Sequence, residues 1–467
     1  MKIAFVHYHL KTGGVTTVLK NQVSALQGRC ETLVLTGDRA GTRMACPVVE
    51  IPGLGYDRPD MDTVPPEAVA EMVQQAICEV WPEGCDLIHV HNPTLAKNRR
   101  FLRIIKRLQQ LGVKFFLQIH DFAEDGRPDA YFDESYPADC HYGVINRRDA
   151  DILIKAGLKA QGLHLLPNAV TPLPVSPGQG KKELILYPVR AIRRKNIGEA
   201  ILLSLFLENG LRLAITQPPN SPADIYRYRE WVDWAKGHPL PVDFAAGQKT
   251  DFAVLVGAAQ SMITTSIAEG FGFAYLEPWT AGKFVWGRRL KAICRDFEKQ
   301  GIHLEGLYDR LDVPLAWIDA ETFADQWQAT VLRAAMTFGF PLDKTGVRTA
   351  YDWLTVRGQV DFGILNEPFQ RQVLEKVLHD PSCKRTLRSL NPWLAAIGVP
   401  SNPAAIITHN RRAVARHYAI HACGERLMEI YRLVVSKPVC HRIDKTALLS
   451  AFFDLERFSL LKWNASA

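Results

Sequence analysis

The sequence predicts two successive α/β domains, each built on a doubly wound parallel sheet, followed by a mostly helical extension. Short apolar runs alternate with amphipathic segments of helical length over the first 170 residues, and this alternation restarts after residue 182. A stretch rich in proline and glycine, without periodicity, lies between the two patterns. The predicted parts are an N-terminal domain, a linker, a second domain and the extension, at 1–170, 171–182, 183–330 and 331–467.

The first domain opens on a buried-strand pattern at 3–6, and apolar residues then recur at helical spacing from Val15 to Leu26. A second helix is predicted over 69–80. The remaining short apolar runs predict strands at 32–35, 87–90, 115–119 and 142–145.

The second domain shows the same pattern, with a helix predicted over 197–207. Its apolar runs predict strands at 184–189, 211–215, 242–244, 262–265 and 284–286. Two such domains joined by a hinge predict a ligand site in the cleft between them. The amphipathic stretch 448–463 is expected to pack back on the N-terminal domain. The alternative is contact with a membrane surface, which its few basic residues disfavour.

Composition excludes several classes of protein. The 467 residues are 47% hydrophobic and 22% charged, which excludes a disordered chain. No apolar stretch approaches the roughly 18 residues of a membrane helix. Nine cysteines without CxxC spacing favour reduced thiols and a cytoplasmic location. The net charge of +7, without a run of like charges, permits a phosphate ligand but predicts no nucleic-acid partner.

Three loops carry candidate chemistry. Gly13 and Gly14 stand between the first strand and its helix, where free N–H groups can face an anion. A tight turn alone would also favour these glycines. The second loop follows the strand at 184–189 and carries four cations, which suit phosphate or a solvated surface, namely Arg190, Arg193, Arg194 and Lys195.

The third loop follows the strand at 262–265 and reads EGFGFAYLE from Glu269 to Glu277. A helix is expected to begin near Phe273, so that one carboxylate lies in the loop and the other on the helix. Carboxylates suit vicinal hydroxyls of a sugar or ribose, and the glycine amides can face a phosphate.

These motifs together resemble the retaining glycosyltransferases of the GT-B fold, of the glycosyltransferase family 4 type. EGFGFAYLE resembles the E-x7-E signature, and Arg190 with Lys195 resembles the Arg…Lys pair of that family. The stretches DLIHVHNP (86–93) and LQIHD (117–121) resemble its paired histidine-bearing strands. The resemblance covers roughly residues 1–290.

The resemblance implies a nucleotide-diphosphate sugar as donor, with no cofactor or metal required. It implies transfer of a hexose with retention of the anomeric configuration. Its implied catalytic residues are His120, Arg190, Lys195 and Glu269. Its implied donor-binding residues are Gly13, Gly14, Arg190, Lys195, Glu269, Gly270, Phe271, Gly272 and Glu277.

The acceptor is expected to be a small polar molecule or carbohydrate, such as a sugar, polyol or hydroxy-acid. The polar segment after His120 suits such a ligand, although an exposed acidic loop is the alternative. The candidate acceptor residues are His91, Asp121, Glu124, Asp125, Arg127 and Arg288, with Asn98 and Arg99 as further candidates nearby.

Arg288 stands where the family commonly has a glycine-rich turn, so a surface cation is its alternative reading. His417, His421 and Cys423 lack an established zinc-ligand spacing, and no metal site is predicted. The alternative functions are a nucleotide-sugar epimerase of the same fold and a non-catalytic sugar-nucleotide-binding protein. The nucleotide, the sugar, the acceptor and the oligomeric state are not encoded in any pattern of the sequence.

Overall fold

The computed structural model describes residues 1–38, 41–58, 64–176, 183–398 and 402–463. Part of the predicted linker, residues 177–182, lies outside the described residues. By its internal contacts the chain divides into two compact units. Unit 1 comprises Met1–Val170 and Arg416–Phe453, and unit 2 comprises Thr171–Ala415 and the segment that begins at Asp454.

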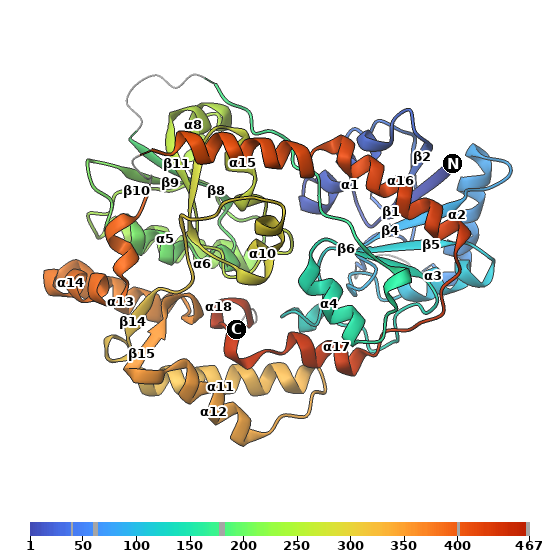
Figure 1. Cartoon of the computed structure of the whole chain (residues 1–467). Helices are drawn as coiled ribbons and strands as arrows, with labels where there is room; N and C mark the ends of the chain where they lie inside the picture. The colour runs from blue at the N-terminus through green and yellow to red at the C-terminus, as the bar shows by residue number, and fades with distance from the viewer. Residues whose placement is uncertain (39–40, 59–63, 177–182, 399–401, 464–467) are drawn as a thin grey trace. The chain divides into compact units, whose positions relative to one another are not determined.

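Unit 1 is built on a seven-stranded parallel sheet in the order β3-β2-β1-β4-β5-β6-β7 (Figure 1). Its strands are β1 (Lys2–His7), β2 (Glu31–Thr36), β3 (Val48–Glu50), β4 (Leu87–His91), β5 (Phe115–Ile119), β6 (His141–Val144) and β7 (Leu163–Leu165). Its helices are α1 (Gly14–Leu26), α2 (Pro66–Val80), α3 (Phe101–Gln110), α4 (Arg147–Lys155), α16 (Ile420–Ser436) and α17 (Lys445–Phe452).

Both faces of this sheet are covered, because successive side chains of a strand point to opposite faces. Ile3 and Phe5 pack with residues of α1 and α16. Ala4 and Val6 pack with residues of α2, α3, α4 and α17. The chain therefore returns near its end to complete the core of unit 1, through α16 against α1 and α17 against α4.

Unit 2 is built on a six-stranded parallel sheet in the order β10-β9-β8-β11-β12-β13. Its strands are β8 (Leu184–Arg190), β9 (Arg212–Gln217), β10 (Val242–Asp243), β11 (Ala259–Thr264), β12 (Phe284–Arg288) and β13 (Leu307–Tyr308). The helices between and after these strands are α5 (Ile197–Ser204), α6 (Pro222–Lys236), α7 (Ala246–Lys249), α8 (Phe252–Ala258), α9 (Glu277–Thr280) and α10 (Lys291–Lys299).

The segment after residue 310 is mostly helical, as the sequence predicts. It also contains an antiparallel strand pair, β14 (Asp312–Pro314) with β15 (Gln359–Asp361), that the sequence analysis missed. Its helices are α11 (Ala320–Thr337), α12 (Lys344–Leu354), α13 (Glu367–His379), α14 (Pro381–Leu390), α15 (Ala404–His417) and the terminal α18 (Leu460–Trp463). Within unit 2, α13 contacts α5 and α18 contacts the turn Arg193–Lys195.

Strand order reverses once in each sheet, between β1 and β4 in unit 1 and between β8 and β11 in unit 2. Ligands of open α/β sheets bind beyond the carboxyl ends of the strands at such a switch point. The loops that the sequence analysis selected lie at these places. The glycine loop follows β1, the cationic loop follows β8, and the loop with Glu269 follows β11.

Candidate functional site

In unit 2, hydrogen bonds join the cationic loop after β8 to the loop after β11 that carries Glu269. The buried Tyr187 of β8 donates its hydroxyl to the backbone oxygen of Lys195 at 2.6 Å and accepts from the backbone N–H of Thr265 at 3.1 Å. The Thr265 hydroxyl reaches the backbone oxygens of Lys195 and Asn196 at 3.1 and 3.0 Å. The two loops therefore form one continuous surface beside the switch point.

This arrangement brings Lys195 and Glu269 into a direct ion pair. Their side chains are only 16% and 8% exposed. Burial opposes ionisation of Glu269, but Lys195 and then Arg194 outweigh it and lower the pKa of the Glu269 carboxyl. Glu269 is therefore ionised at neutral pH, and its carboxylate is held against the Lys195 side chain.

Glu277 lies near this pair but is not part of it. The expected helix from Phe273 is instead a 3-10 turn over Phe273–Tyr275, and α9 begins at Glu277 itself. Gly272 precedes the turn with φ +92°, where a Cβ would lie 2.8 Å from the Tyr275 ring. Burial raises the pKa of Glu277 to about 7. Within the described residues the Glu277 carboxylate makes no hydrogen bond or ion pair.

The four cations of the loop have different surroundings. Arg190 is exposed and makes one long contact, from its guanidinium to the Pro218 oxygen at 3.4 Å. Arg193 donates twice to the buried Glu367 of α13, at 2.7 Å each. Arg194 reaches the Ala268 oxygen at 3.5 Å. The extension thus holds Arg193 inside the protein, and Arg190 and Lys195 remain beside the switch point.

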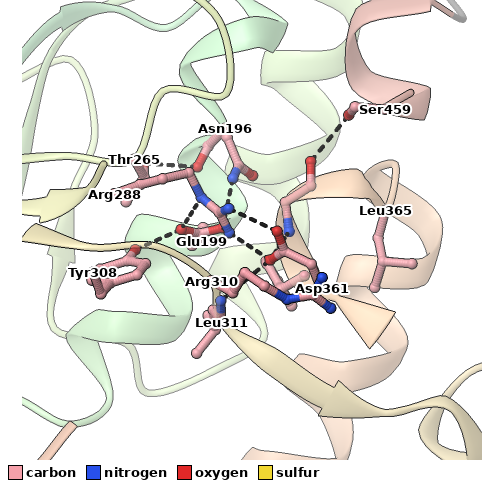
Figure 2. A network of polar contacts seen from close by, with 12 residues as sticks. Asn196, Glu199, Thr265, Arg288, Tyr308, Arg310, Leu311, Asp361, Leu365 and Ser459 are labelled. Atoms are coloured by element: carbon pink, nitrogen blue, oxygen red, sulfur yellow. Dashed lines mark hydrogen bonds and ion pairs between the residues drawn. The ribbon is translucent and has the colours of Figure 1, made fainter. Parts of the chain in front are cut away.

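Arg288 does not lie where an acceptor could reach it, and its prediction as an acceptor residue is corrected. Figure 2 shows its guanidinium between two carboxylates. It donates to Glu199 at 2.8 and 2.6 Å and to Asp361 at 2.8 and 2.7 Å. Tyr308 donates to the same Glu199 at 2.5 Å. Arg288 donates four hydrogen bonds and its side chain is only 7% exposed, which indicates a structural role.

The carboxyl ends of β4 and β5 in unit 1 bring His91 and His120 together. Their rings stack, and the Nδ1 of His91 lies 2.8 Å from the Nε2 of His120. The Asn92 side chain accepts from the backbone N–H groups of His120 and Asp121 at 2.7 and 3.2 Å. Burial lowers the pKa of His120 to about 4, so the ring is neutral at physiological pH.

The polar segment after His120 is paired rather than open. Asp121 binds Arg127 at 3.0 Å, and Asp125 binds Arg148 of α4 at 3.4 Å. Sequence analysis missed Arg148, because it lies in a different element 23 residues away.

Glu124 is fully buried and accepts from the Tyr136 hydroxyl at 2.9 Å. Its prediction as an acceptor residue is therefore corrected, because the carboxyl faces the interior. The remaining predicted residues of unit 1, Gly13 and Gly14, are exposed at the start of α1. A Cβ on Gly14 would meet no atom within 4 Å, so packing does not require a glycine there.

Comparisons with known proteins identify the architecture. No family model matches the chain. The mannosylglucosyl-3-phosphoglycerate synthase of Petrotoga mobilis is 28% identical over 356 residues, which cover 66% of this chain and 68% of the relative. Sucrose-phosphate synthase from Thermosynechococcus elongatus superposes with a TM-score of 0.53 at 15% identity, over 92% of this chain and 98% of the other. HepE from Anabaena, crystallised with UDP and glucose, gives 0.53 at 13% identity over the same shares.

These two solved structures match almost the whole of both chains. The chain has the GT-B glycosyltransferase fold. The fold class and the resemblance to GT-B glycosyltransferases that the sequence predicts are thereby confirmed. In GT-B terms, the Lys195–Glu269 pair lies at the switch point of the C-terminal sheet and the His91–His120 pair lies beside that of the N-terminal sheet.

No helix among the described residues is long and apolar enough to cross a membrane. No group of three His, Cys, Asp or Glu side chains in the same part of the chain could hold a metal ion.

Proposed function

We propose that this protein is a retaining glycosyltransferase of the family 4 type. It moves a hexose from a nucleotide-diphosphate sugar to a hydroxyl of a small polar or carbohydrate acceptor. The observation that carries the proposal is the Lys195–Glu269 ion pair beside the exposed Arg190, at the carboxyl edge of β8 and β11. A cation and a carboxylate at one switch point suit the diphosphate and the sugar of a nucleotide sugar.

The proposed donor contacts follow from the charges. Transfer leaves negative charge on the diphosphate, which Arg190 and Lys195 stabilise, so no metal or other cofactor is required for that step. Glu277 accepts from the ribose hydroxyls. Glu269 holds the transferred sugar together with the backbone N–H groups of Gly270, Phe271 and Gly272. The UDP and glucose of the HepE crystal structure support a nucleotide sugar as the ligand class.

The proposed contributions of unit 1 concern the acceptor and the anomeric centre. His120 lies beside that centre, with its neutral ring held by His91. Gly13 and Gly14 approach the diphosphate. The polar groups of Asp121, Asp125 and Arg127 bind the acceptor at their outer faces, since each remains partly exposed.

The relative from Petrotoga mobilis supports a polar acceptor, because the product in its name carries a phosphoglycerate group. We propose a small-molecule acceptor and no nucleic-acid partner. A cytoplasmic location is supported by nine free cysteines.

The test is release of nucleoside diphosphate from UDP-, GDP- and ADP-hexoses, offered with mixed small acceptors, by the wild type and two variants. Lys195→Ala removes the proposed diphosphate contact. Lys236→Ala is the matched control, because Lys236 is 70% exposed on α6 and, in the described part of the chain, has its one ion pair with Asp233. Circular dichroism confirms that each variant is folded.

Acceptor-dependent release that is lost in Lys195→Ala and kept in Lys236→Ala supports the proposal. The anomeric configuration of the product, read by proton NMR, tests retention. Release that persists in Lys195→Ala, or an inverted product, overturns the assignment. Donor binding without release, or interconversion of the donor sugar, favours the binding-protein or epimerase alternative.

A further inference from the structure

Unit 1 contains a pocket of about 470 Å³ that none of the proposed donor contacts uses. The loops after β2, β3 and β4 line it, so it opens at the same carboxyl edge as His91 and His120. Three arginines line it, namely Arg58, Arg99 and Arg100. Its position at the carboxyl edge of a parallel sheet is typical of ligand sites in such folds.

The wall of the pocket is fixed by buried polar contacts. Asn98 is fully buried and donates its side-chain amide to the backbone oxygens of Gly53 and Gly55, at 2.7 and 2.8 Å. The backbones of Gly37 and Gly55 touch, so that a Cβ on Gly37 would lie 1.8 Å from the Gly55 nitrogen. Glycine is required at such close backbone approach. The pocket is therefore shaped before any ligand arrives.

Two of the three arginines are oriented by carboxylates. Arg58 binds Asp38 at 3.0 Å, and Lys11 binds the same carboxylate at 2.8 Å. Arg100 binds Asp57 at 3.2 Å. Two cations thus share Asp38, and this side of the pocket keeps a surplus of positive charge.

Arg99 is the remaining cation. Its backbone N–H donates to the Asp57 carboxylate at 2.8 Å, which fixes its Cα. Its guanidinium is exposed and has no ion pair or hydrogen bond within the described residues. Among the described residues the lining carries three arginines and three carboxylates, those of Asp38, Glu50 and Asp57, and Lys11 outside the lining shares Asp38 with Arg58.

We propose that this pocket binds the anionic group of the acceptor, a phosphate or a carboxylate, with Arg99 as its principal contact. A guanidinium offers paired N–H donors that match either oxyanion. Arg58 and Arg100 are paired with carboxylates, so Arg99 supplies the charge for an anionic group, and the neighbouring carboxylates accept from hydroxyl groups of the same ligand. The acceptor class is then an anionic hydroxylated molecule. The inference that the bound anion is the acceptor rests on the proposed function. The inference that the pocket binds an anion does not depend on it.

Binding to the full chain tests the site directly, by isothermal titration with and without UDP. The probes are 3-phosphoglycerate, glycerol 3-phosphate, glycerate and glycerol, which separate phosphate from carboxylate recognition. Arg99→Gln removes the charge. Arg103→Gln is the matched control, because Arg103 lies one helical turn further on, outside the pocket, and pairs with Glu134 on the surface.

We expect at least one anionic probe to bind the wild type and Arg103→Gln, and glycerol to bind neither. Arg99→Gln should lower the affinity for that probe about tenfold, because it removes a charge-assisted contact in a half-open site. Arg99→Lys should retain part of the affinity, and the affinity should fall as salt is added. No binding of any anionic probe, or equal binding by Arg99→Gln, overturns the inference.

Nucleoside-diphosphate release separates this outcome from failure of the proposed function. Where release from a nucleotide sugar occurs, Arg99→Gln should raise the KM of an anionic acceptor about tenfold with kcat unchanged. Unchanged KM with active transfer overturns the pocket and keeps the transferase. Intact anion binding without any release overturns the transferase and keeps the pocket.

Discussion

Replacement of Arg288 by methionine tests whether its buried network stabilises unit 2. Methionine keeps the unbranched apolar stem of the side chain but removes the guanidinium. Glu199 and Asp361 then lose their common cation within the interior (Figure 2). Breaking a buried ion pair by removal of one partner costs about 3–5 kcal/mol, because the remaining charge is desolvated without compensation.

The loss of stability caused by Arg288→Met depends on pH. In the wild type, burial opposes ionisation of Asp361, but Arg288 outweighs it and lowers the pKa of that carboxyl. Burial raises the pKa of Glu199 above its usual value even beside Arg288. Loss of Arg288 raises the folded-state pKa of both carboxyls further, although the Gly363 N–H and Arg310 still lower that of Asp361. Such a group destabilises the fold most at high pH, and the loss shrinks as pH falls toward the unfolded pKa, by about 1.4 kcal/mol per pH unit for each carboxyl.

Tryptophan fluorescence during denaturation by urea is the assay, because nine of the ten tryptophans belong to unit 2 and only Trp81 to unit 1. Arg212→Met is the control. Arg212 binds Asp243 twice, at 3.1 and 2.7 Å, but both side chains are about half exposed. An exposed pair of this kind contributes at most about 1 kcal/mol.

The expected result is a loss of about 3–5 kcal/mol for Arg288→Met at pH 8, smaller at pH 5, and a small loss for Arg212→Met. Adding Glu199→Gln and Asp361→Asn to Arg288→Met should recover more than half of the loss. Equal losses in the two single variants, or a loss that grows as pH falls, would refute the reasoning.

Three further predictions concern other parts of the chain. If Glu277 binds the ribose hydroxyls as proposed, affinity for a nucleotide sugar should fall as pH drops through about 7, because protonation removes the carboxylate charge and turns one acceptor oxygen into a donor. Calorimetry should show a flat pH profile for Glu277→Gln. Burial also raises the pKa of Asp149 to about 7, so Asp149→Asn should stabilise unit 1 at pH 8 but not at pH 4, measured by thermal unfolding. Gly424→Ala should destabilise unit 1 by about 1–3 kcal/mol, because its Cβ would lie 2.4 Å from the Ala25 oxygen of α1, and an unchanged melting temperature would contradict that packing.

Sequence patterns predicted the strands that carry the site and missed several of the short ones. β1, β4, β5 and β8 have five to seven residues each, enough for an apolar run to be visible. β3 and β7 have three residues each and β13 has two, too few to show a period, whereas the equally short β10 falls in the strand predicted at 242–244. The helix expected from Phe273 was wrong at its start, because the turn after Gly272 is of the 3-10 type.

The site itself was predictable where partners lie in neighbouring loops, and not where they lie far apart in the chain. The Lys195–Glu269 contact follows from two loops that leave adjacent strands. Arg288 could not be told from a surface cation, because Glu199 and Asp361 lie 89 and 73 residues away. Likewise, the amphipathic pattern of α16 shows a buried face without showing which sheet it covers.

The return of α16 and α17 to unit 1 also sets an order of events during synthesis. The side chains of Leu427 and Tyr431 are fully buried against the first sheet, and Tyr431 lies 2.8 Å from the Nδ1 of His89. A ribosome that has released residue 170 has therefore not yet made the helix that closes this core. Unit 2 is almost completely translated before unit 1 can finish folding, so a nascent chain exposes the apolar surface of unit 1 that α16 and α17 cover until residues 416–453 emerge.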